Sequence, residues 1–253
     1  MPDYELILWN MENFDINSIK FVKQAYDAGK FAFAADYIRS YAVYNEGGLY
    51  FDSDVYARKS FDDLLHYDFF SSLERDLTTV SPDDDYVKVF KKNENLINHE
   101  VGKIKGFGLQ AAVFGAKAGN ILLKDIMEWY ENHEFLLPDG QTMQSKLVAP
   151  DIYAAIAQKY GFKYTAGFQQ LKNNMVILPA DYFPNHLYKT DNAYAVHLCD
   201  NSWSGLSRYS GSKRINLIDK IKRNNVVRKL FGKRKYIDMD WEQKILLGGE
   251  YKL

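Results

Sequence analysis

The chain has 253 residues, of which 47% are hydrophobic and 15% are aromatic, so one catalytic domain with a substantial buried core is the default expectation. No run approaches the roughly 18 to 20 apolar residues of a membrane span, and the first residues lack a signal-peptide layout, which favours a cytoplasmic protein. The formal net charge is −1, and the single cysteine, Cys199, excludes an intrachain disulfide.

The spacing of apolar residues predicts short strands that alternate with helices along the chain. In the first part we expect a strand at 4–9, helices at 16–28 and 31–44, and strands at 49–51 and 69–73. In the second part we expect a strand-like stretch at 107–114, helices at 121–130 and 151–160, and strands at 176–178 and 193–198. Asp151 is predicted to cap its helix. This alternation predicts a single α/β domain with a mostly parallel central sheet flanked by helices.

The end of the chain is strongly basic. Residues 213–235 contain ten of the 32 Lys and Arg residues but only one of the 33 acidic residues. Apolar residues recur among them at helical spacing, which predicts a basic amphipathic helical segment within 211–253. Such a helix can lie on the anionic inner face of a membrane, or it can pack on the body with its charges in water. Nucleic-acid binding is not expected, because no recognised module accompanies the basic residues.

The most informative motif is LYFDSDV at 49–55, in which an apolar strand leads into two carboxylates. Alternate residues of a strand share a face, so Asp52 and Asp54 are predicted to converge on one ion. Hard cations such as Mn²⁺ and Mg²⁺ bind one or two carboxylates together with substrate phosphates. Asp-x-Asp also occurs in acidic surface turns, so the surrounding sequence has to support this interpretation.

That surrounding sequence resembles a known family. The block AADYIRSYAVYNEGGLYFDSDV at 34–55 is similar to the signature of the bacterial DXD-containing sugar transferases of glycosyltransferase family 32, which the large clostridial glucosylating toxins share in outline. The stretches VILPADYFP at 176–184 and HLCDNSW at 197–203 resemble later parts of the same family. The resemblance implies a GT-A-like, Rossmann-related fold and retaining transfer from a nucleotide sugar, usually a UDP-sugar. It also implies Mn²⁺ or Mg²⁺ as cofactor and a role in the synthesis of surface polysaccharides on a glycan or lipid-linked acceptor.

The resemblance also implies roles for individual residues. Asp36, Arg39, Asp52 and Asp54 would be catalytic, and Asp52, Asp54 and His197 would lie at the metal. The donor would be bound by a larger set of residues: Asp36, Arg39, Tyr50, Gln110, Ser202 and Trp203. Without the resemblance, Asp36 and Arg39 form an ordinary helical ion pair, Tyr50 is a core residue, and His197 is a buried histidine.

Two further expectations concern the boundaries of the domain and the competing functions. The catalytic domain is expected at 1–210, and it lacks the Ile-Pro-Lys-Ile-Ile-His-like first strand with which family members usually begin. One alternative is therefore an impaired remnant that binds sugar nucleotide weakly. A second alternative is a phosphohydrolase of the haloacid-dehalogenase type, which also places Asp-x-Asp after an apolar strand. That class prefers Thr or Val two residues after the second Asp, and this chain has Tyr56 there.

Overall fold

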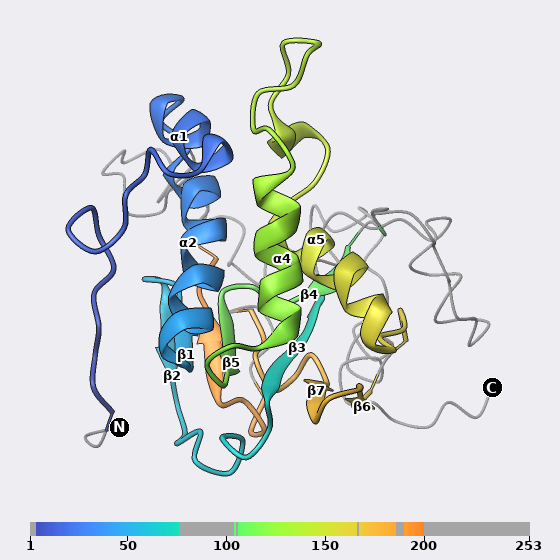
Figure 1. Cartoon of the computed structure of the whole chain (residues 1–253). Helices are drawn as coiled ribbons and strands as arrows, with labels where there is room; N and C mark the ends of the chain where they lie inside the picture. Colours follow the sequence, from blue (N-terminus) through green and yellow to red (C-terminus); the bar gives the residue numbers. More distant parts are fainter. Residues whose placement is uncertain (1–3, 76–103, 105, 166, 186–189, 200–253) are drawn as a thin grey trace, which may run out of the picture.

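The computed structural model describes residues 4–75, 104, 106–165, 167–185 and 190–199 (Figure 1). Its helices are α1 (Lys20–Asp27), α2 (Phe31–Glu46), α4 (Ile121–Glu131) and α5 (Ala149–Ala157), with short 3-10 turns η1 (Met143–Ser145) and η2 (Gln158–Tyr160). Its strands are β1 (Gly48–Phe51), β2 (Val55–Ala57), β3 (Phe69–Arg75), β4 (Phe107–Leu109), β5 (Val113–Ala116), β6 (Gln169–Gln170), β7 (Met175–Leu178) and β8 (Ala195–His197). Within these residues, no helix combines the length and the apolar character needed to cross a membrane.

The mixed α/β architecture is confirmed, but the mostly parallel sheet is wrong for the described strands. Six of them form one sheet in the order β1-β5-β3-β7-β6, with β4 also paired to β3, and β2 and β8 form a separate two-stranded sheet. Among the pairings of the six-stranded sheet, only β3 with β7 is parallel. The reason is the path of β5, which inserts between β1 and β3 and runs antiparallel to both. Apolar periodicity predicts where a strand lies but not which neighbour it pairs with.

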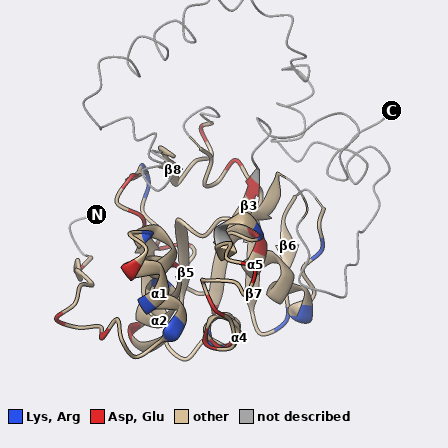
Figure 2. Ribbon diagram, turned by 90° about the horizontal axis from the view of Figure 1, so that it is seen from above, with Lys and Arg blue, Asp and Glu red and all other residues tan. Residues whose placement is uncertain are grey.

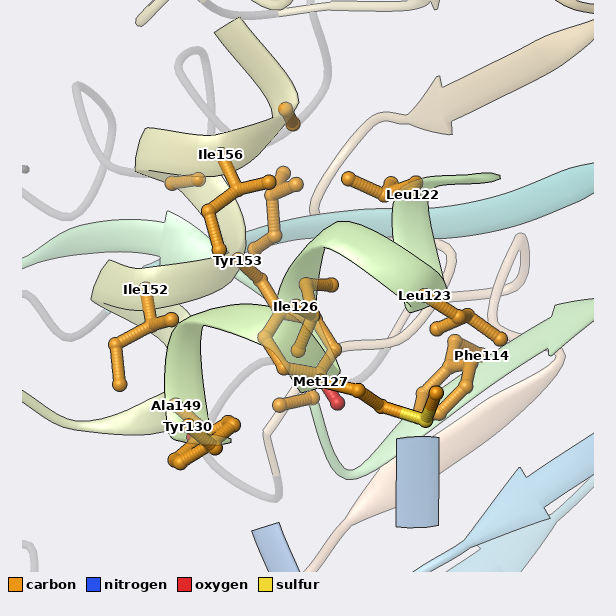
Figure 3. Close-up of a cluster of buried hydrophobic side chains, with 14 of the residues drawn as sticks. Phe114, Leu122, Leu123, Ile126, Met127, Tyr130, Ala149, Ile152, Tyr153 and Ile156 are labelled. Atoms are coloured by element: carbon orange, nitrogen blue, oxygen red, sulfur yellow. The ribbon is translucent and has the colours of Figure 1, made fainter. Parts of the chain in front are cut away.

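Both faces of the sheet are covered by apolar side chains. On β3, Phe69 and Leu73 belong to the larger core, whereas Phe70 belongs to a second cluster with Phe61 and Phe183. The same alternation holds on β7, because successive strand residues point to opposite faces. Figure 3 shows part of the larger core, to which α4 contributes Ile126, α5 contributes Tyr153 and β5 contributes Phe114. A sheet buried on both faces holds its strand ends, and hence the loops between them, in fixed positions.

Helix α2 is buried along most of its length, because it packs on α1, α4 and the strands β1 and β5 (Figures 1 and 2). It ends at Gly47, which has a φ of +72°, a conformation that residues with a side chain rarely adopt. A Cβ atom there would lie 2.9 Å from the backbone nitrogen of Ala118. The glycine therefore lets the chain turn directly from α2 into β1, which leads into the turn with Asp52 and Asp54.

Several predicted elements differ from the structure. Residues 4–9 form no strand, and Leu6 is 95% exposed, because this segment has no strand partner among the described residues. The helix predicted at 16–28 begins only at Lys20, after a turn in which Asp15 accepts hydrogen bonds from Asn17. The predicted stretch 107–114 is two strands separated by a turn. Asp151 lies inside α5 rather than at its cap, and its carboxylate accepts a hydrogen bond from the amide of Val148.

Candidate metal and donor site

Asp52 and Asp54 lie on the turn that joins β1 to β2. The amide of Val55 donates to the carbonyl of Asp52 at 3.0 Å, which closes the turn, so the two carboxylates converge through a turn and not through strand alternation. The amide of Asp52 donates to the carbonyl of Ala112 at 2.9 Å, which holds Asp52 against the start of β5. The first carboxylate is thereby attached to the central sheet.

His197 reaches this turn through a small second sheet. Strand β8 pairs antiparallel with β2, and His197 lies opposite Val55. The amide of Leu198 also donates to the carbonyl of Asp54 at 2.9 Å. His197 Nε2 lies 3.3 Å from Asp54 Oδ1 as a result. The predicted neighbours Asp54 and His197, far apart in sequence, are therefore in contact.

Together Asp52, Asp54 and His197 form a group suited to a divalent cation. One ligand atom from each residue lies within 4.8 Å of the others, and all three side chains are partly exposed. Burial alone would lower the pKa of His197, but its interactions with Asp54 and Cys199 raise that pKa to about 11. The ring is therefore protonated at neutral pH, and a cation bound by its nitrogen would displace that proton.

Asp36 and Arg39 lie beneath Asp52, one helical turn apart on α2. Arg39 Nη2 is 2.9 Å from Asp36 Oδ1 and 3.4 Å from Asp52 Oδ1, so one guanidinium bridges two carboxylates. Burial raises the pKa of Asp36 to about 7 against the lowering effect of Arg39, and the charge on Asp52 adds to the increase. Asp36 and Arg39 are 7% and 6% exposed. Their predicted contact with a donor sugar stays a prediction.

Tyr50 and Gln110 occupy different positions. The Tyr50 hydroxyl donates to Asp52 Oδ1 at 2.7 Å, so Tyr50 lies beside the acidic turn, and its predicted contact with the donor stays a prediction. Gln110 lies in the turn between β4 and β5 and is 2% exposed. Its side-chain oxygen accepts the amide of Ala112 at 2.9 Å, and its side-chain nitrogen lies 3.5 Å from the carbonyl of Phe183. The amide of Gln110 is thus bonded within the protein, and donor contact by this residue also stays a prediction.

Some predicted site residues fall outside the described part of the chain. Ser202 and Trp203 are among them, as are the basic segment 213–235 and the whole of 211–253. Other contributors were missed by sequence reasoning. The carbonyls of Ala111 and Ala112 bind Arg39 and the amide of Asp52, and no side-chain pattern marks them. Cys199 is another, because its Sγ lies 3.5 Å from His197 Nδ1, and the sequence offers no signal for it beyond its position two residues after His197.

Comparison with known proteins gives two matches. Residues 1–70 match the family described as glycosyltransferase sugar-binding region containing DXD motif. The chain is also similar to inositol phosphoceramide mannosyltransferase 3 of the fission yeast Schizosaccharomyces pombe, with 36% identity over 70 residues, or 26% of this chain. The match spans about a fifth (20%) of that relative's length.

No solved structure gives a significant match. The family match agrees with the site geometry, because residues 1–70 include α2, the turn with Asp52 and Asp54, and Tyr50. The family resemblance seen in the motif at 34–55 is thereby supported at the level of glycosyltransferases. Residues 1–70 resemble the DXD-containing sugar-binding region of glycosyltransferases.

Proposed function

We propose that this chain is a metal-dependent glycosyltransferase that transfers a hexose or N-acetylhexosamine from a nucleotide sugar. The observation that carries the proposal is the convergence of Asp52, Asp54 and His197 within 4.8 Å, next to a region similar to glycosyltransferase sugar-binding regions. UDP is the expected nucleotide, and family 32 is the expected family, from the motif at 34–55.

The residues present fit a manganese or magnesium ion. Two carboxylates supply the oxygen ligands that both cations take, and an imidazole suits manganese better than magnesium. The partial exposure of all three side chains leaves room for phosphate oxygens to complete the coordination. With His197 neutral, as binding of a cation by its nitrogen would require, Asp36, Arg39, Asp52 and Asp54 carry three negative charges and one positive charge when ionised, which suits the site to a cation.

The chemistry that such a site supports is departure of a nucleoside diphosphate. When the bond between sugar and phosphate breaks, negative charge builds on the diphosphate, and a bound divalent cation stabilises that charge. Asp52, Asp54 and His197 would hold the ion in place, and Ser202 and Trp203 would cover the phosphates. In the front-face retaining reaction that the resemblance implies, the acceptor hydroxyl would approach on the face that the diphosphate leaves and give its proton to an oxygen of that diphosphate, so no protein nucleophile needs to attack the sugar.

A lipid-linked or glycan acceptor completes the proposal. The fission yeast relative is by its name a mannosyltransferase of inositol phosphoceramide, which is consistent with an acceptor at a membrane. The basic segment 213–235 would bring the chain to the anionic inner face of that membrane. Flotation with liposomes tests this contact: recovery should require anionic lipid, and equal recovery with neutral liposomes would contradict it.

The enzymatic proposal is tested by release of nucleoside diphosphate. The full chain is incubated with a panel of UDP-sugars and GDP-sugars, including glucose, galactose, mannose and N-acetylhexosamine donors, with Mn²⁺, with Mg²⁺ or with a chelator. We expect metal-dependent release from at least one donor, and loss of that release in Asp52→Ala and Asp54→Ala. The proposal is wrong if the folded chain releases no diphosphate in any condition. It is also wrong if Asp52→Ala and Asp54→Ala release as much diphosphate as the wild type.

The same assay separates the two alternatives. An impaired remnant would bind a sugar nucleotide in a metal-dependent way without releasing diphosphate. A phosphohydrolase of the haloacid-dehalogenase type would instead release phosphate from a simple phosphate monoester and ignore the sugar nucleotides. The similarity of residues 1–70 to glycosyltransferase sugar-binding regions counts against the phosphohydrolase alone, so release of diphosphate is what separates the transferase from the remnant.

A further inference from the structure

Two side-chain hydroxyls meet in the core next to the candidate site. The hydroxyl of Tyr153, on α5, lies 2.5 Å from the Oγ atom of Ser40, on α2. Both residues are 0% exposed, and a hydrogen bond that is shielded from water is stronger than one at the surface. Either hydroxyl would be a costly unsatisfied group without the other. The pair therefore holds α5 and α2 together at one separation.

Ser40 places this hydrogen bond beside the ion pair of α2. It follows Arg39 in the sequence, and its Oγ atom lies 3.5 Å from the carbonyl of Asp36. Burial raises the pKa of Tyr153, and the charges of Arg39 and Asp36 both act on its hydroxyl, with opposite signs. Arg39 Nη2 in turn lies 3.4 Å from Asp52 Oδ1. A shift of α2 relative to α5 would therefore change the contact between Arg39 and Asp52.

Tyr153 is also linked to the strand that leads into the acidic turn. Its ring packs edge-on against Phe114 of β5, with the ring centroids 5.9 Å apart (Figure 3). Phe114 stacks on Tyr50 of β1, with centroids 5.5 Å apart, and the Tyr50 hydroxyl donates to Asp52 Oδ1. Aromatic pairs favour a few relative orientations, so each ring restricts the next. One side chain of α5 thus reaches Asp52 by two routes, through α2 and through β5 and β1.

We propose that Tyr153 is a positioning residue, whose hydroxyl holds α2 through Ser40 and thereby sets the distance between Arg39 and Asp52. This inference rests on the proposed function, because it assumes that Asp52 binds the metal. Hydrogen-bond partners of a metal ligand fix its orientation, and losing one typically lowers metal affinity about 10- to 100-fold. Tyr153 acts one step further from the ligand, so its effect should be smaller than that of a direct partner.

The test compares two fully buried tyrosines of the same core. Tyr153→Phe removes the hydroxyl that binds Ser40, and Ser40→Ala removes the other partner. Tyr130→Phe is the matched control, because Tyr130 is also 0% exposed but its hydroxyl has no hydrogen-bond partner within the described part of the chain. Urea denaturation measures the stability of each variant. Titration of the folded, full chain with Mn²⁺, with free Mn²⁺ followed by electron paramagnetic resonance, measures metal affinity.

We expect Tyr153→Phe and Ser40→Ala each to weaken Mn²⁺ binding about threefold or more, a smaller loss than that of a direct partner. The double variant should bind like either single variant, because both changes remove the same hydrogen bond. Tyr130→Phe should bind Mn²⁺ like the wild type.

A hydrogen bond with a purely structural role would give a different result. Tyr153→Phe and Ser40→Ala would then lower stability and leave the Mn²⁺ affinity of the folded chain unchanged, which would overturn the inference while the proposed function stands. Equal weakening of Mn²⁺ binding in Tyr130→Phe would also overturn it, since any change in this core would then have the same effect. If the wild type binds no Mn²⁺, the proposed function fails and this inference fails with it.

Discussion

The two carboxylates of the acidic motif are held in different ways. On the inner side of the site, Asp36 and Arg39 are buried in α2, and they join Tyr50 and the partly exposed Asp52 in one hydrogen-bonded group between α2 and the sheet. On the outer side, Asp54, His197 and Cys199 lie on the two-stranded β2–β8 sheet and its continuation. The comparison indicates that one half of the site is part of the core, whereas the other half depends on a short pairing near the surface.

Removing Arg39 should have the largest effect, because it breaks the inner side. Arg39→Ala leaves the carboxylates of Asp36 and Asp52 next to each other without their shared cation. Loss of one partner from a buried ion pair costs about 3–5 kcal/mol, so we expect that decrease in the free energy of unfolding, measured by urea denaturation. Arg58→Ala is the control, since its exposed side chain donates only to the carbonyl of Thr190, and it should cost less than about 1 kcal/mol. If Arg39→Ala and Arg58→Ala lowered the free energy of unfolding equally, the buried ion pair would not contribute more than an exposed contact, contrary to this account.

Gln110→Ala should have the next largest effect. It leaves the buried amide of Ala112 without its acceptor, and Ala112 in turn receives the amide of Asp52. An unsatisfied buried polar group costs about 1–3 kcal/mol, which denaturation would detect. If Gln110 instead contacts the donor, stability would be unchanged and only the Michaelis constant for the donor would rise.

The pKa of Asp36 predicts how stability depends on pH. This pKa is about 7 in the folded protein, mainly because of burial, against about 3.9 in an unfolded chain. The folded state therefore binds the proton of Asp36 more tightly than the unfolded state does. The contribution of Asp36 to the free energy of unfolding is largest below about pH 4 and falls as pH rises toward 7, by up to about 1.4 kcal/mol per pH unit. The charged groups facing Asp36 are Arg39 and Asp52.

Asp36→Asn cannot ionise and should lack this decrease. The measurement is the difference in free energy of unfolding between variant and wild type from pH 4 to pH 8. As pH rises, the free energy of unfolding of Asp36→Asn should increase relative to that of the wild type. A difference that is independent of pH would show that Asp36 does not titrate in this range.

The outer side should give the smallest change in stability. His197 and Asp54 are linked through the short β2–β8 pairing and not through the central sheet, so His197→Ala should cost about 1 kcal/mol, the net value of one hydrogen bond, while Mn²⁺ affinity falls. Thermal unfolding and Mn²⁺ titration of the same sample check both halves of the statement. A large loss of stability together with unchanged Mn²⁺ affinity would make His197 a structural residue.

The sequence predicts the local parts of this site better than its assembly. Helix α2, its glycine end and the apolar strand β1 follow from residue spacing, and they place Asp52 correctly at a strand end. His197 entered only through the family resemblance, because no periodicity shows that β8 pairs with β2. The insertion of β5 and the carbonyls of Ala111 and Ala112 were not predictable, since backbone acceptors are the same in every residue. The segment at 4–9 shows the opposite case, a strand-like pattern that finds no partner among the described residues.

The central claim is that Asp52, Asp54 and His197 hold a divalent cation that a nucleoside diphosphate shares. Calorimetric titration of the folded, full chain with Mn²⁺ and then with UDP tests it most directly. We expect one Mn²⁺ site per chain, UDP binding that requires Mn²⁺, and loss of both in Asp52→Asn and Asp54→Asn. A folded protein that takes up neither Mn²⁺ nor UDP would contradict the account.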